Sequence, residues 1–302
     1  MKQGVTIGWI GTGRMGAPMV ERLKAAGHTV LVYSRRDSGV RGSDEADVAE
    51  LASRVSIMVT CVPGPAEVRE LWMQSSGLLE NMKSGSTAVD MSTIGSELAI
   101  ELAEAAARVG VDFIDCPVSG GPAAAHSGSL SIMAGGAETA VAAARPVLEE
   151  LGRVFYCGPA GSGQLVKMIN QAILAGMMAG IGSGFALASR AGLDLDLVAD
   201  ILGEGVTRGY LLNAMWPRMS RGEDSGGFAV SLMRKDLGLS SAEAKSRDLD
   251  LPLLELVDAI YARVESALGP DVGTQTIGQG MLMAANIRQR SAAILDTSGE
   301  GE

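Results

Sequence analysis

The sequence predicts an α/β fold in two parts, a doubly wound parallel sheet over residues 1–161 followed by an all-α domain over residues 162–290. Three observations support this prediction. Short apolar runs alternate with helical sequence through the first half, a pattern typical of parallel sheets. A glycine-rich turn joins the first apolar run to the first helical stretch, and no strand pattern recurs after residue 161.

Composition supports a folded protein with a large core. The chain has 302 residues, of which 47% are hydrophobic and 20% are charged, which is enough for about two domains. Its net charge is −10 and it contains no Lys/Arg-rich run, so we expect no nucleic-acid partner. Residues 172–188 are apolar but interrupted by glycines, and residues 1–4 show no signal peptide, so we expect no membrane partner.

Cysteine usage points to a reducing compartment. The chain has three cysteines, Cys61, Cys116 and Cys157, which lie far apart and form no C-x-x-C pattern. A disulfide framework is therefore not expected, and we predict a cytoplasmic location. Each cysteine fits a small core residue better than a nucleophile.

The elements follow one another in a regular order. We expect strands at 5–10, 29–34, 55–62, 86–90, 112–115, 130–134 and 153–157, and helices between most of them at 15–26, 66–74, 96–109 and 137–151. In the second part we expect helices at 162–191, 196–202, 211–220, 231–246, 253–268 and 276–290, with Gly192 ending the first. Residues 291–302 are small, polar and acidic, and we expect a flexible tail.

The first turn carries the strongest functional signal. An apolar strand leads directly into a G-x-G-x-x-G motif that opens a helix, which is the context of a Rossmann-type dinucleotide-binding site. The first glycine would make the tight turn, the second would admit the pyrophosphate, and the third would let the helix pack on the strand. The motif consists of Gly11, Thr12, Gly13, Arg14, Met15 and Gly16.

The end of the second strand indicates which dinucleotide is bound. An acidic residue at this place would bind the ribose of NAD, but the sequence there reads Ser34, Arg35, Arg36. Two guanidiniums suit the 2′-phosphate of NADP(H), which we therefore prefer over NAD(H). NAD(H) stays open as an alternative, because Asp37 could reach the ribose if the turn folds back.

The inventory of reactive groups narrows the chemistry. Neither of the two histidines belongs to an H-E-x-x-H motif, so no metal site is predicted: His28 fits a structural role in a turn, and His126 is expected in a loop. Lys167 stands in an otherwise apolar helix, with Asn170 and Gln171 on the same face. Desolvation can bring a lysine pKa toward the working pH of a general acid/base, although a lysine that extends its ammonium to the surface fits the same pattern.

Four motifs together resemble the β-hydroxyacid dehydrogenase family, which includes 3-hydroxyisobutyrate dehydrogenase and tartronate semialdehyde reductase. They are the glycine loop in residues 8–19, the segment 115–121 continuing to 128–136, the segment 161–171 around Lys167, and Phe228 with Lys235, Asp236 and Leu237. The resemblance extends through residue 290.

The resemblance implies a role for each site residue. Lys167 would be the general acid/base, Ser119 with the backbone of Gly120 and Gly121 would hold the substrate carboxylate, and Asn170 would orient lysine and substrate. Val62, Pro63 and Thr93 would line the nicotinamide side, and Lys235 would close over the cofactor. The remaining candidates on the substrate side are Gln171, Phe228 and Asp236. Further residues of the α-domain that could line the pocket are Arg208, Tyr210 and Trp216. For Trp216 and Phe228, a role in the hydrophobic core is at least as suitable. The family also implies a homodimer or homotetramer that pairs through the α-domain.

The resemblance implies hydride transfer between NADP(H) and a short β-hydroxy acid or its semialdehyde. The alternatives are a reductase of another small carbonyl, such as succinic semialdehyde or glyoxylate, or of an imine, and a cofactor-binding module without activity.

The chain departs from the family in three places. The stretch between Arg36 and Val55 is short, so the helix after the second strand is expected to be trimmed or missing, which weakens the NADP(H) prediction. Gln171 replaces an asparagine that some members carry, and residues 122–125 offer no second anion site, so we do not favour phosphorylated or sulfonated substrates.

Overall fold

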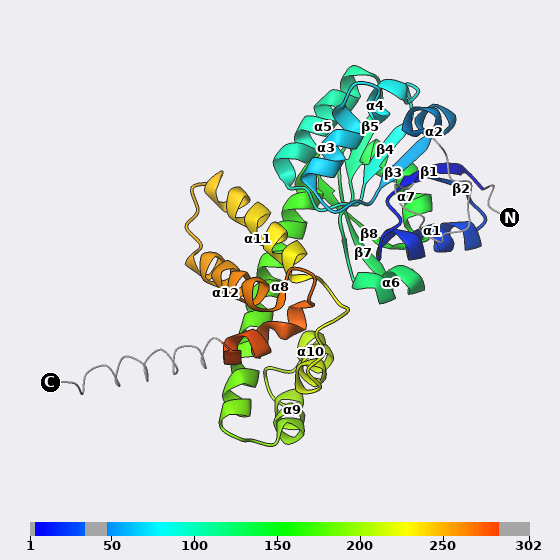
Figure 1. Ribbon diagram of the computed structural model, residues 1–302. Helices are drawn as coiled ribbons and strands as arrows, with labels where there is room; N and C mark the ends of the chain where they lie inside the picture. The colour runs from blue at the N-terminus through cyan, green and yellow to red at the C-terminus, as the bar shows by residue number, and fades with distance from the viewer. Residues whose placement is uncertain (1–3, 34–46, 284–302) are drawn as a thin grey trace. The chain divides into compact units, whose positions relative to one another are not determined.

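The computed structural model describes residues 4–33 and 47–283 (Figure 1). The chain forms two compact units, the first ending at Ile169 and the second beginning at Asn170. This division lies inside helix α8 (Ser162–Arg190), whereas the sequence placed it just before the helix.

Five parallel strands form the main part of the sheet in the first unit. They are β1 (Thr6–Ile10), β2 (Thr29–Tyr33), β3 (Ile57–Thr60), β4 (Thr87–Asp90) and β5 (Asp112–Asp115), in the order β2-β1-β3-β4-β5. Each of them lies within an apolar run that the sequence predicted as a strand. The order reverses between β1 and β3, and ligands of open α/β sheets bind at such a switch point, beyond the carboxyl ends of the strands.

The far end of the sheet departs from the predicted parallel arrangement. Strand β7 (Leu130–Gly135) runs antiparallel to β5 and to β6 (Val118–Ser119), and only β8 (Gly152–Gly158) pairs with β7 in parallel. The reason is the short connection from β6 to β7 through helix α6 (Gly121–Ser127), because a short return favours antiparallel neighbours and a parallel pair needs a longer crossover. Strand β6 itself was not predicted.

Helices cover both faces of this sheet and complete two hydrophobic cores. On one face α1 (Gly16–Ala25), α6 and α7 (Glu138–Leu148) pack over strand residues such as Trp9. The other face holds α2 (Val48–Arg54), α3 (Pro65–Met73), α4 (Leu78–Asn81) and α5 (Ser96–Arg108), which pack over residues such as Ile10 (Figure 1). Neighbouring strand residues point to opposite faces, so one strand contributes to both cores.

Three short helices of this unit were not predicted, namely α2, α4 and α6. Helix α2 is present after the second strand and has seven residues, so the helix expected there to be trimmed or missing is not missing. Its N-terminus is capped by Asp47, whose side chain accepts a hydrogen bond from the Ala49 backbone N–H. His126 lies in α6 rather than in a loop, which corrects the prediction.

The second unit is helical, as predicted. It contains the rest of α8 with α9 (Leu195–Glu204), α10 (Tyr210–Ser220), α11 (Val230–Lys245) and α12 (Pro252–Leu268), followed by a 3₁₀ turn at Thr274–Thr276. Gly192 adopts a positive φ of 69° just after α8 and ends that helix as expected. The core includes Phe185 and Trp216, whose rings meet edge to face with centroids 5.5 Å apart.

Helix α8 has 29 residues and is long and apolar enough to cross a membrane. Length and composition of this kind also occur in core helices of proteins that do not enter a membrane. Buried side chains of α8, among them Ala175, Met178 and Phe185, form part of the core of the second unit. Part of the apolar surface of the helix is therefore packed in this core, since 33% of its apolar stretch is buried.

Candidate cofactor and active site

The glycine loop after β1 has the geometry that a pyrophosphate requires. Gly11 adopts a φ of +98°, and a Cβ there would lie 2.2 Å from the Cys61 carbonyl oxygen. A Cβ on Gly16 would lie 1.9 Å from the Gly11 carbonyl oxygen, while a Cβ on Gly13 would meet nothing within 4 Å. The outer two glycines thus allow close packing inside the protein, and Gly13 leaves its outer side open to a ligand.

The N-terminus of α1 is suited to an anion. Met15 at the N-cap provides no side-chain cap, and the first turn contains no acidic residue. Its N–H groups and the positive end of the helix dipole therefore remain available for phosphate. Arg14, which is exposed, adds a positive charge beside the loop. These residues fit a dinucleotide.

The carboxyl end of β3 lies beside that of β1. The Cys61 backbone N–H donates to the Ile10 carbonyl oxygen at 2.9 Å, and the Val62 N–H donates to the Ser92 hydroxyl at 2.9 Å. Val62 and Thr93 are half-buried in the loops after β3 and β4, whereas Pro63 is exposed. Of the nicotinamide-side residues inferred from the resemblance, Val62 and Pro63 therefore follow β3 at the switch point, and Thr93 follows the neighbouring strand β4.

A buried carboxylate holds these two loops together. Asp90 Oδ1 accepts hydrogen bonds from the Thr60 hydroxyl at 2.6 Å and from the Ser92 hydroxyl at 2.8 Å. The Trp72 indole N–H donates in turn to the Thr60 hydroxyl at 3.0 Å. Burial raises the pKa of Asp90 to about 6, despite the hydroxyl hydrogen bonds that lower it.

Lys167 lies in the first turns of α8 and is 8% exposed. Its Nζ donates to the Val118 carbonyl oxygen at 2.9 Å. Val118 directly precedes Ser119, and both belong to β6, so the structure brings the predicted catalytic lysine next to the predicted carboxylate-binding segment. Gly120 and Gly121 follow with φ values of 134° and 72°, and a Cβ on Gly121 would meet nothing within 4 Å.

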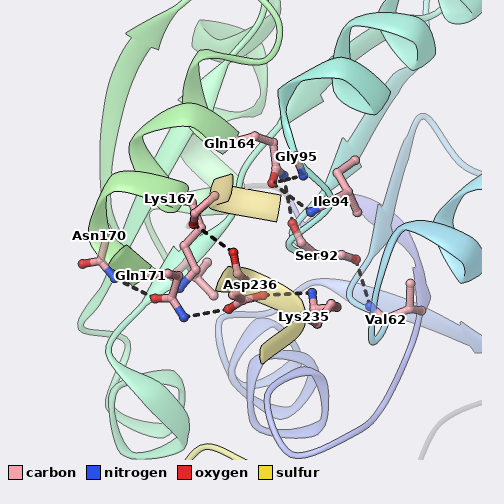
Figure 2. Close-up of polar contacts among 12 residues, drawn as sticks. Val62, Ser92, Ile94, Gly95, Gln164, Lys167, Asn170, Gln171, Lys235 and Asp236 are labelled. Atoms are coloured by element: carbon pink, nitrogen blue, oxygen red, sulfur yellow. Dashed lines mark hydrogen bonds and ion pairs between the residues drawn. The ribbon is translucent and has the colours of Figure 1, made fainter. Parts of the chain in front are cut away.

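Two further side chains, Asp115 and Gln164, tie the beginning of α8 to the sheet. The Asp115 carboxylate accepts from the backbone N–H groups of Gly161 and Gln164, each at 2.8 Å. The Gln164 carboxamide accepts from the Ile94 N–H at 2.9 Å and donates to the Ser92 carbonyl at 2.9 Å (Figure 2). Sequence reasoning assigned no role to either residue, although both stand inside quoted motifs.

In the second unit, four predicted residues form one polar chain (Figure 2). The Asn170 amide donates to Gln171 Oε1 at 2.8 Å, and the Gln171 amide donates to Asp236 Oδ2 at 2.7 Å. Lys235 Nζ lies 3.0 Å from Asp236 Oδ1. Gln171 and Asp236 are buried, whereas Asn170 and Lys235 are half-buried, so the buried pair connects the two more accessible groups.

The remaining candidates of the second unit divide between core and surface. Phe228 is partly buried against the core, and Trp216 lies inside it with its indole N–H donating to the Leu195 carbonyl at 3.0 Å. Arg208 and Tyr210 are exposed. Trp216 therefore has the core role that the sequence left open as an alternative.

Ser34, Arg35 and Arg36 lie outside the described residues. His28 has the structural role expected of it, because its Nδ1 accepts from the Val5 N–H at 3.3 Å. Burial, together with the Asp90 charge, raises the pKa of the Cys61 thiol to about 12, which argues against a thiolate nucleophile there. Within residues 4–33 and 47–283, no three His, Cys, Asp or Glu side chains form a metal-binding group.

Comparison with known proteins identifies the two parts of the chain. Residues 6–158 match the NAD-binding domain of 6-phosphogluconate dehydrogenase, and residues 161–279 match the NAD-binding domain of NADP-dependent 3-hydroxyisobutyrate dehydrogenase. The 3-hydroxyisobutyrate dehydrogenase of Pseudomonas aeruginosa is 35% identical over 271 residues, which cover 85% of this chain and 91% of that protein.

Solved structures agree with these matches. The Mycobacterium tuberculosis 3-hydroxyisobutyrate dehydrogenase with L-serine superimposes with a TM-score of 0.83 at 28% identity, covering 92% of this chain and 99% of that one. Psf3 in complex with NADP+ and 2-OPP gives a TM-score of 0.83 at 28% identity, with coverage of 91% and 99%.

Proposed function

Since the chain belongs to the 3-hydroxyisobutyrate dehydrogenase family of NAD(P)-binding hydroxyacid dehydrogenases, we propose that it interconverts a short β-hydroxy acid and its semialdehyde with NADP(H). Lys167 is the general acid/base of this reaction. The observation that carries the proposal is the position of Lys167, whose Nζ lies 2.9 Å from the Val118 carbonyl, directly beside Ser119.

The division of labour follows from the chemistry. The nicotinamide supplies or accepts the hydride, and the protein must move one proton and hold the substrate. In the reductive direction the Lys167 ammonium gives a proton to the carbonyl oxygen, and in the oxidative direction the neutral amine takes the hydroxyl proton. Because Lys167 is nearly buried, its hydrogen bonds act in a poorly hydrated environment, where they are stronger than in water.

The substrate carboxylate is held by Ser119 together with the backbone of Gly120 and Gly121. Their positive φ values permit successive N–H groups to converge on an anion. Asn170 orients the substrate and lysine from α8, and Gln171 with Asp236 supports Asn170 and Lys235 from buried positions. Lys235 closes over the cofactor, and Phe228 borders the substrate.

NADP(H) is the preferred cofactor. The support is the Arg35–Arg36 pair that follows the second strand in place of a carboxylate, since guanidinium pairs bind a 2′-phosphate through charge-assisted hydrogen bonds. Replacing both arginines by alanine should raise the KM for NADPH by at least about 10-fold and leave that for NADH nearly unchanged. A preference for NADH in the unaltered protein would instead assign the ribose to Asp37.

The protein acts as a homodimer or homotetramer that pairs through the α-domain, in a reducing cytoplasm. Support comes from an apolar surface on α8, where Ile173, Met177 and Leu187 are 58%, 50% and 72% exposed. Large exposed apolar surfaces of this kind mark association sites. A second copy of the same chain is the occupant that we propose, and a monomer in light scattering would contradict it.

Cofactor oxidation by the purified protein tests the function. NADPH and NADH are each supplied with glyoxylate and with succinic, tartronate and methylmalonate semialdehydes. We expect turnover with NADPH on at least one semialdehyde, with loss of turnover in Lys167→Ala. Tight NADPH binding without turnover on any compound would contradict the proposal and favour a module without this activity.

A further inference from the structure

We propose that Asp115 is the positioning residue that sets the place of Lys167, by anchoring the first turn of α8 to the carboxyl end of β5. This inference rests on the proposed role of Lys167 as general acid/base. It assigns a task to a side chain that does not itself contact the reacting atoms.

The contacts of Asp115 engage both of its oxygens. Oδ1 accepts from the Gly161 N–H and Oδ2 from the Gln164 N–H, each at 2.8 Å. The carboxylate is fully buried, and the N–H groups that it binds are those that the start of a helix leaves unpaired. A negative charge at this end also interacts favourably with the helix dipole. Asp115 therefore acts as an N-terminal cap supplied from the sheet.

Two glycines allow this close approach. A Cβ on Gly135 would lie 2.6 Å from Asp115 Oδ1, and a Cβ on Gly163 would lie 2.7 Å from Asp115 Oδ2 and 2.2 Å from the Met133 carbonyl oxygen. Any side chain at Gly163 would therefore push the first turn of α8 off the carboxylate. The absence of a side chain at both glycines therefore permits the Asp115 carboxylate to contact the first turn of α8.

Lys167 follows Gly163 by one helical turn and lies on the same side of the helix. A shift of the first turn is consequently transmitted along the rigid helix to the lysine and to its contact with the Val118 carbonyl. A displacement of about 1 Å at a reacting group can reduce the rate about 100-fold. Gln164 adds a second tie between this turn and the Ser92–Gly95 loop, so the turn is fixed at two points.

The test compares Asp115→Asn with Asp112→Asn, which removes an exposed carboxylate from the first residue of the same strand. Asparagine keeps one acceptor, but its NH2 group faces a backbone N–H, so one anchoring bond is lost. We expect kcat of Asp115→Asn to fall about 10- to 100-fold. The Kd for NADPH should stay within about twofold of that of the unaltered protein, and the number of NADPH sites per chain should not change. Asp112→Asn should match the unaltered protein.

A double variant separates positioning from a general structural effect. If Asp115 acts through Lys167, Asp115→Asn should cause no further loss in a Lys167→Ala background, whereas a structural defect would lower the residual rate by the same factor. A folded Asp115→Asn protein with kcat within twofold would overturn the inference. Normal activity of Lys167→Ala would instead overturn the proposed function, so the two failures are distinguishable.

If Asp115→Asn does not fold, Gly163→Ala disturbs the same contact from the helix side. Gly176→Ala on α8 is its control, because a Cβ there meets only Leu253 Cδ2 at 3.9 Å. A lowered kcat with intact NADPH binding in Gly163→Ala supports the inference. An unchanged kcat overturns it, and failure of both variants to fold would make Asp115 a determinant of folding rather than a positioning residue.

Discussion

Replacing Asp90 by asparagine should change how the stability of the protein depends on pH. The asparagine carboxamide would keep an oxygen that accepts from the Thr60 and Ser92 hydroxyls, so the two hydrogen bonds of 2.6 and 2.8 Å are retained. What the substitution removes is the capacity to ionise in a fully buried position. The comparison therefore isolates the cost of a buried charge.

The magnitude follows from the raised pKa. Burial raises the pKa of Asp90 from 3.8 to about 6, and because one pKa unit corresponds to about 1.4 kcal/mol, the ionised form costs folding about 3 kcal/mol. For a raised pKa, the stabilising contribution is complete below pH 3.8 and is lost as the pH rises through 6. Between about pH 4.5 and 8, the stability of the native protein relative to Asp90→Asn should thus decrease by about 2 kcal/mol.

Urea unfolding at several pH values, followed by tryptophan fluorescence, measures this difference, since Trp72 contacts Thr60 in the same cluster. Asp112→Asn, which removes an exposed carboxylate from β5, serves as the control for the loss of one negative charge. A difference for Asp90→Asn that is constant with pH, or that grows in favour of the native protein as pH rises, would refute the reasoning.

Three further predictions concern the loop, the polar chain and the surface. Gly13→Ala should leave the melting temperature unchanged, because the added Cβ meets nothing within 4 Å. It should raise the Kd for NADPH, measured by fluorescence titration, at least about 10-fold. Unchanged binding would contradict the assignment of the loop to the pyrophosphate. Gln171→Leu leaves the buried Asp236 Oδ2 without its donor and should destabilise the protein by about 2 kcal/mol in urea unfolding, and no loss would mean that the polar chain adds nothing to stability. Ile173→Lys combined with Met177→Lys should yield monomers in light scattering, and an unaltered molar mass would place the interface elsewhere.

Local sequence was sufficient to predict the elements whose signals are local. The apolar runs of β1 to β5 have the length of strands, and the glycines of the loop after β1 have a fixed spacing. Both signals lie among neighbouring residues, so the strands and the turn could be predicted from local sequence. Helix α8 was likewise predicted nearly to its ends. By contrast, β6 has two residues, too few for a periodic pattern, and its pairing with β7 depends on how the chain returns.

The same distinction applies to the site. Lys167 is conspicuous because a charge interrupts an apolar helix, and the motif around it is contiguous. Asp115 precedes Gly161 by 46 residues, and Gln164 follows Ile94, in the loop that it holds, by 70 residues. A helix cap supplied by a distant strand leaves no capping signature in the helix's own sequence, so its role follows only from the tertiary contacts.

The central claim is that Lys167 moves the proton while the glycine loop holds the cofactor. The most direct measurement is kcat of Lys167→Ala on the semialdehyde that the protein reduces, made together with the Kd for NADPH of the same preparation. We predict a fall in kcat of about 100- to 10,000-fold with a Kd within about twofold of the unaltered protein. Retained turnover, or loss of NADPH binding in parallel with activity, would contradict the account.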